Sequence, residues 1–137
     1  MTKDALARRA ADIIDDMDEE IGEFLADAER GHHDEDERAE DTAGEYGAVL
    51  EAFLANARAA NKGDAETVMS AVKNAVLALN ALEERYGMLG RFMLFCADEE
   101  DGVTRGEKVR ELIRLAAAEA GVGDGEEDPT GKWREKW

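Results

Sequence analysis

Apolar residues recur along most of the chain at spacings of three and four, which is the period of an amphipathic α-helix. The longest such series has the alternating spacing of a heptad seam, and its members are Ala7, Ala10, Ile14, Met17, Ile21, Phe24 and Ala28. The sequence contains no alternating run of β-branched residues of the kind that predicts strands. The pattern therefore predicts an all-α protein.

Start and stop signals divide this pattern into four predicted helices. Their expected ranges are about 3–30, 42–61, 64–97 and 105–120. Asp64 and Thr104 are the expected N-caps of the third and fourth helices, and Gly31 and Gly121 are expected to end the first and fourth. Tyr46 is expected on the apolar face of the second helix.

The second range follows a capping box formed by Thr42 and Glu45, and a start nearer Glu37 is the alternative. Gly87 and Gly90 interrupt the third range, and they predict a kink there or the close approach of another helix.

Four amphipathic helices joined by short connections predict an up-and-down four-helix bundle with long first and third helices. We expect this acidic bundle to occupy residues 1–121. Residues 122–137 differ in composition, because a flexible, Gly-rich acidic linker leads to a short basic tail that holds both tryptophans of the chain. The chain is therefore expected to consist of a bundle and an extended C-terminal tail.

Composition then narrows the classes of function. The chain has 137 residues, of which 44% are hydrophobic, so it is long and apolar enough for one core. Its formal net charge of −17 repels phosphate, so direct nucleic-acid binding is not expected. Scarce lysine beside abundant Asp and Glu is also typical of proteins from high-salt cells, and a halophilic source is an alternative explanation of the charge.

The expected setting is reducing and intracellular. Cys96 is the one cysteine, so an internal disulfide and a cysteine-based zinc site are both excluded. No apolar run reaches the length of a membrane span, and no secretion signal is recognisable at the start. We expect a cytoplasmic protein, or a virion protein if the source is viral, that does not contact a membrane.

The C-terminal tail is the segment most typical of an interface. Trp133 and Trp137 lie four residues apart, so one helical turn would place both rings on the same face. Arg134 and Lys136 lie between them, and large aromatic residues and arginine are common anchors in protein interfaces. These four residues are predicted to bind a partner protein or another copy of the chain. The alternative is that the tail folds back onto its own acidic bundle.

The first predicted helix also contains Glu19-Glu20-Ile21-Gly22-Glu23, a Glu-Glu-x-x-Glu element. Over roughly residues 10–75 the chain resembles the MazG-type all-α nucleotide pyrophosphohydrolases. In that family a second helix supplies Glu-x-x-Asp, and the carboxylates hold Mg²⁺ on a nucleoside triphosphate. Here Asp41 and Glu45 are the nearest substitute, spaced four apart rather than three.

The resemblance implies a metal site formed by carboxylates of two helices, namely Glu19, Glu20, Glu23, Asp41 and Glu45. It also implies a Mg²⁺-dependent pyrophosphohydrolase, active or degenerate, with Mg²⁺ as its cofactor. The alternative interpretation is that these carboxylates form the solvated outer face of the first helix.

Three hypotheses of function follow. The first is a non-enzymatic interaction module without a cofactor, such as a small adaptor or structural subunit of a larger assembly, for example a virus particle, that docks through its tail. The second is the pyrophosphohydrolase. The third is an acidic inhibitor that mimics DNA, because a row of carboxylates along a long helix resembles a phosphate backbone and attracts a basic nucleic-acid-binding protein.

Overall fold

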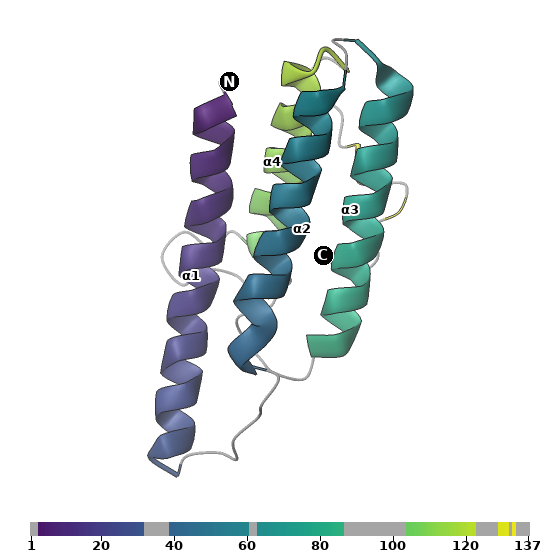
Figure 1. Ribbon diagram of the computed structural model, residues 1–137. Helices are drawn as coiled ribbons and strands as arrows, with labels where there is room; N and C mark the ends of the chain where they lie inside the picture. Colours follow the sequence, from purple (N-terminus) through teal and green to yellow (C-terminus); the bar gives the residue numbers. More distant parts are fainter. Residues whose placement is uncertain are drawn as a thin grey trace.

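The chain forms four α-helices in a computed structural model (Figure 1). The structure describes residues 3–31, 39–60, 63–86, 104–122, 129–131 and 133. The helices are α1 (Lys3–Glu29), α2 (Ala39–Ala59), α3 (Ala65–Tyr86) and α4 (Arg105–Glu119). The predicted all-α, four-helix class is confirmed, because the described residues contain these helices and no strand.

Helix α1 forms where the long apolar series predicts it. It ends one residue before the expected position, and Gly31 follows with a φ of 80°. That left-handed conformation suits glycine, and the Gly31 N–H donates to the Ala28 carbonyl, which satisfies one of the last carbonyls of the helix. Ile13, Met17 and Ile21 are buried along the inner face.

Helix α2 corrects one prediction. It begins at Ala39, so Thr42 lies inside the helix and does not serve as its N-cap. The reason is burial: Thr42 is fully enclosed and lies one turn before Tyr46, which is also buried. Burial of this face favours extending the helix upstream, so the capping box expected from Thr42 and Glu45 is wrong and the earlier start is closer to the structure.

The ends of α3 and α4 follow the sequence signals. Asp64 accepts hydrogen bonds from the N–H and the hydroxyl of Thr67 at the start of α3, at 3.2 and 2.8 Å. Thr104 accepts from the Glu107 N–H at 3.1 Å and caps α4. Gly121 ends α4 with a φ of 82°. The predicted extension of the third helix to residue 97 lies outside the described residues, as do Gly87, Gly90 and Cys96.

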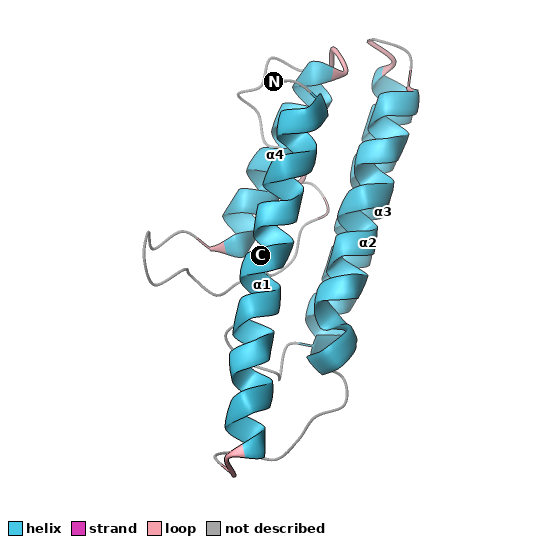
Figure 2. Cartoon of the chain, turned by 60° about the vertical axis from the view of Figure 1, so that its left-hand side comes forward, coloured by secondary structure: helices cyan, strands magenta, loops and turns pink. Residues whose placement is uncertain are grey.

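Each of the four helices packs against at least two of the others. Helix α2 lies between α1 and α3 and has its most extensive contacts with these two, while α4 packs mainly against α1. Figure 2 shows α1 and α4 along one side of the molecule and α2 and α3 along the other. The turn after α2 is fastened to the end of α4, because the Gly63 N–H donates to the Ala120 carbonyl at 2.8 Å.

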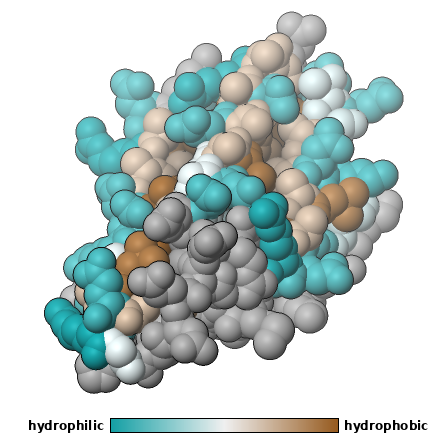
Figure 3. All heavy atoms as spheres, turned by 60° about the horizontal axis from the view of Figure 1, so that its bottom comes forward, coloured by the Kyte–Doolittle hydropathy of each residue, from teal (hydrophilic) through white to brown (hydrophobic). Residues whose placement is uncertain are grey.

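One continuous core runs between the four helices. Its largest fully buried apolar members come from every helix, and they are Met17, Tyr46, Phe53, Leu50, Leu79, Leu112 and Ile113. Trp133, from the C-terminal segment, packs against the edge of this core. Hydrophilic residues cover most of the described surface in the view of Figure 3, with small hydrophobic spots between them. None of the described helices has the length and apolar character needed to cross a membrane.

Replacing Asp64 with alanine tests the N-cap of α3. The Thr67 hydroxyl, and after it the Thr67 N–H, hold the pKa of Asp64 below its usual value of 3.8. A lowered folded-state pKa stabilises the protein above the unfolded value, and this contribution disappears as the pH falls through the folded value. Urea denaturation should therefore show Asp64→Ala less stable than the parent at neutral pH, with the difference shrinking in acid. A difference of the same size at all pH values would contradict this role.

Candidate functional site

The most enclosed charged group in the described structure is the guanidinium of Arg105, at the first residue of α4. Its side chain is 1% exposed. Nε donates to Oδ2 of Asp16 at 2.9 Å, and Nη2 donates to Oε1 of Glu20. Asp16 and Glu20 lie one turn apart on α1 and are themselves partly buried. One arginine therefore binds two carboxylates of a different helix.

Local sequence explains why the arginine can reach this position. The Thr104 cap fixes the start of α4, so Arg105 occupies its first turn. Gly106, the next residue, is also buried. A cation at a helix N-terminus is unfavourable by itself, because the end of the helix is already partly positive. The carboxylates of Asp16 and Glu20 offset the charge of the guanidinium and the partial positive charge of the helix end. They therefore stabilise the position of α4 against α1.

A second ion pair fixes the same two helices further along. Arg9 on α1 lies 3.2 Å from Glu111 on α4, and both side chains are largely exposed. An exposed pair of this kind contributes at most about 1 kcal/mol. Together with the Arg105 contacts it defines the antiparallel register of α1 and α4, because the earlier residue of α1 pairs with the later residue of α4.

The carboxylates predicted to bind Mg²⁺ are placed in different surroundings. Glu20 binds Arg105, and Glu45 lies 3.3 Å from Arg85 of α3. Glu19, Glu23 and Asp41 are exposed. Within the described ranges, no three His, Cys, Asp or Glu side chains are grouped so that they could hold a metal ion. Pyrophosphohydrolase activity stays a prediction. In this structure two of its predicted metal ligands, Glu20 and Glu45, form ion pairs with arginines.

A buried polar contact joins α2 to α3 near the Glu45–Arg85 pair. The hydroxyl of Tyr46 donates to Oε1 of Glu83 at 2.6 Å, and both residues are almost completely enclosed. The sequence indicated Tyr46 as a core residue but gave no sign that Glu83 would be buried. The tyrosine hydroxyl supplies a hydrogen bond that a buried carboxylate requires.

The beginning of the C-terminal tail folds back onto the bundle. Thr130 is fully buried, and Trp133 packs against the core with part of its surface still exposed. Nδ2 of Asn80 on α3 donates to the Trp133 carbonyl at 2.8 Å. At Trp133 the structure therefore shows the alternative arrangement, in which the tail folds back onto its own bundle. Arg134, Lys136 and Trp137 lie outside the described residues, so their binding to a partner stays a prediction.

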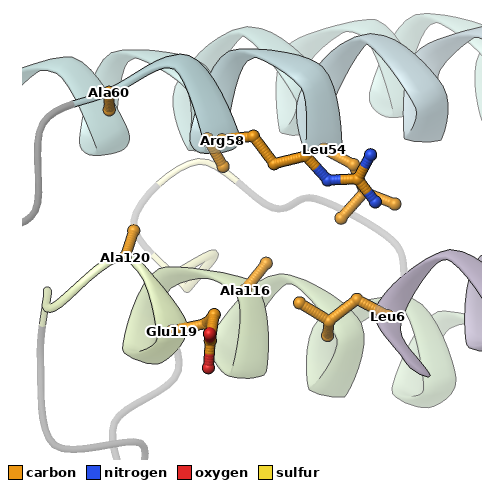
Figure 4. A pocket seen from close by; sticks show the side chains of 8 residues that line it. Leu6, Leu54, Arg58, Ala60, Ala116, Glu119 and Ala120 are labelled. Carbon is orange, nitrogen blue, oxygen red and sulfur yellow. The ribbon is translucent and has the colours of Figure 1, made fainter. Parts of the chain in front are cut away.

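A cavity of about 300 Å³ opens at the end of the bundle where α1 begins and α2 and α4 finish. Figure 4 shows its apolar lining, with Leu6 from α1 and Leu54 from α2 on opposite sides of the opening. The lining also includes Arg58 of α2 and Glu119 of α4. The sequence gave no indication of this cavity, because it depends on how three helix ends diverge.

The outward face of α1 is acidic along most of its length. The exposed carboxylates of α1 are Asp4, Asp12, Asp15, Asp18, Glu19, Glu23 and Glu29. Asp16 and Glu20 are less exposed than these residues, and they bind Arg105 of α4. The predicted solvated outer face of the first helix is therefore present beside a second, internally paired set of carboxylates.

Comparison with known protein families, with curated proteins and with solved structures gives no match. The proposals below therefore rest on the geometry of the molecule.

Exchange of Arg105 for lysine tests whether the guanidinium is required. Lysine keeps the charge but cannot bind two separate carboxylates through a planar fork. We expect Arg105→Lys to lower the free energy of unfolding by about 1–3 kcal/mol in urea denaturation. Arg114→Lys on the same helix is the matched control, because Arg114 lies at the longer distance of 3.9 Å from Glu111 and is more exposed than Arg105. Equal effects of the two exchanges would show that Arg105 has no special role.

Proposed function

We propose that the chain is a non-enzymatic helical interaction module, a small adaptor or structural subunit that docks onto a partner protein through its C-terminal tail. The observation that carries this proposal is the attachment of the tail to α3. Thr130 is buried, Trp133 packs on the core, and Asn80 holds the Trp133 carbonyl. The next residues of the sequence include Arg134, Lys136 and Trp137, which are of the types that anchor interfaces.

This attachment supports docking for an energetic reason. Binding by a flexible tail loses affinity, because its residues must be ordered when the complex forms. A tail that is already fixed at Trp133 avoids the part of that cost that belongs to Trp133 itself. In this proposal Trp133 is a positioning residue, and Arg134, Lys136 and Trp137 make the contacts with the partner.

The distribution of charge also supports an interaction surface. The described basic residues of the bundle lie largely in intramolecular ion pairs, including Arg9 with Glu111, Arg85 with Glu45 and Arg105 with α1. After Trp133 the sequence reads Arg134-Glu135-Lys136-Trp137, so a locally basic segment with a tryptophan follows on a chain with a net charge of −17. A partner site that offers carboxylates and an aromatic pocket would match this tail.

Shortening the chain after Trp133 tests the proposal while keeping the attachment intact. A longer deletion that also removed Thr130 and Trp133 would disturb the core and confuse the result. We expect the shortened chain to keep the helical circular dichroism of the full chain and to lose capture of its partner from a lysate of the producing cells. Asn80→Ala should weaken capture, and Lys73→Ala, an exposed change on the same helix, should not.

Two outcomes would argue against this function. Capture that is unchanged by the shortening would show that the tail does not dock. Release of the captured partner by added duplex DNA would instead support the acidic DNA mimic, since the partner would then be a nucleic-acid-binding protein held by the carboxylates of α1.

A further inference from the structure

A groove separate from the tail runs along the outer side of the α1–α2 pair. It has a volume of about 370 Å³. Its walls are mostly small or apolar, with Ala7, Ala11 and Ile14 contributed by α1 and Gly47, Leu54 and Ala55 by α2. Its lining extends over nine residues of α1 and twelve of α2, which at 1.5 Å per residue corresponds to about 12–16 Å, or two to three helical turns.

The small side chains explain why this side of the pair is hollow. Alanine and glycine have small side chains or none, so they cover little of the helix backbone. A further helix can therefore approach α1 and α2 closely and insert its larger side chains between these two helices. At Gly47 an added Cβ atom would lie 3.7 Å from the side chain of Ile14, which is ordinary van der Waals contact. The Ile14 side chain therefore lies next to Gly47, where α1 and α2 approach each other along the groove.

Charge indicates which kind of helix would fit. Asp15 and Glu51 are exposed residues of the groove lining, one from each helix. The exposed charged residues of α1 near Asp15 are Arg8, Asp12, Asp18 and Glu19, of which three are acidic. Arg58 lies toward the other end, where the groove adjoins the cavity of Figure 4 and shares Leu54 with it. The apolar groove thus has a predominantly acidic border.

We propose that this groove binds a basic amphipathic α-helix of a partner protein. The apolar face of such a helix fills the space between α1 and α2, and its Lys and Arg residues face the carboxylates at the border. A second copy of the chain would bring its own acidic surface to the same border and be repelled. The inference rests on the proposed interaction function and adds a second surface, distinct from the tail, together with the chemistry of its ligand.

A fluorescently labelled synthetic helix of Leu and Lys, with all Leu on one face, is the probe. Fluorescence anisotropy at physiological salt measures its binding to the full chain. Ala55→Leu fills the groove, and Ala52→Leu places the same side chain on an exposed part of α2 outside it. We expect Ala55→Leu to weaken binding at least about tenfold, which corresponds to about 1.4 kcal/mol, while Ala52→Leu leaves it unchanged. Glu51→Gln should also weaken binding, and circular dichroism checks that each variant remains folded.

Three results would overturn the proposal. Equal binding of a scrambled peptide with the same charge would show mere attraction to an acidic protein. Equal binding by the parent and Ala55→Leu, or no binding at all, would show that the groove is not the site. Sedimentation equilibrium that reveals a dimer of the chain alone, dissociated by Ala55→Leu, would assign the groove to a second copy.

The chain shortened after Trp133 separates this inference from the proposed function. It should still bind the Leu–Lys helix, because the described residues that line the groove all belong to α1 and α2. If the Leu–Lys helix fails to bind the full chain but shortening abolishes capture of the partner, only the groove proposal is refuted. If the Leu–Lys helix binds in the groove but shortening leaves capture unchanged, docking by the tail is refuted and the groove remains as the interaction surface.

Discussion

A guanidinium enclosed between two helices must be neutralised where it lies, because an unpaired charge in a protein interior is strongly unfavourable. Arg105 is neutralised by Asp16 and Glu20, which both lie on α1. Burial of this arginine therefore requires that α1 lie against the start of α4. If α4 moved away from α1, the arginine would lose both carboxylates and remain as an unpaired charge. Leu112 and Ile113 of α4 enter the core in the register that this pairing specifies.

The same contact divides the acidity of the first helix into two parts. Asp16 and Glu20 bind Arg105 of α4 and help hold the bundle together, whereas Asp12, Asp15 and Asp18 are exposed. The acidic residues that produce the net charge of −17 therefore have more than one role. The inner carboxylates belong to the fold, and the outer ones give the surface an electrostatic preference for basic partners.

Local signals were sufficient to predict most of the helices. The apolar series gave α1, the Asp64 and Thr104 caps gave the starts of α3 and α4, and glycines followed the ends of α1 and α4. The start of α2 was missed because burial of Thr42 outweighs its preference for a cap position. Contacts between distant residues were not predictable, since Arg105 and Glu20 are separated by 85 positions and meet only through helix packing. The attachment of Trp133 to Asn80 was foreseen only as an alternative, because aromatic and basic residues suit both an internal contact and an interface.

The coupling energy between Glu20 and Arg105 tests most directly the claim that a carboxylate of the Glu-Glu-x-x-Glu element is part of the bundle. A double-mutant cycle with Glu20→Gln and Arg105→Met, followed by urea denaturation, isolates this energy. The cycle with Glu19→Gln in place of Glu20→Gln is the matched control, because Glu19 is its neighbour and is exposed. We predict a coupling of about 1–3 kcal/mol between Glu20 and Arg105, and close to none between Glu19 and Arg105. Equally small couplings for both residues would contradict it.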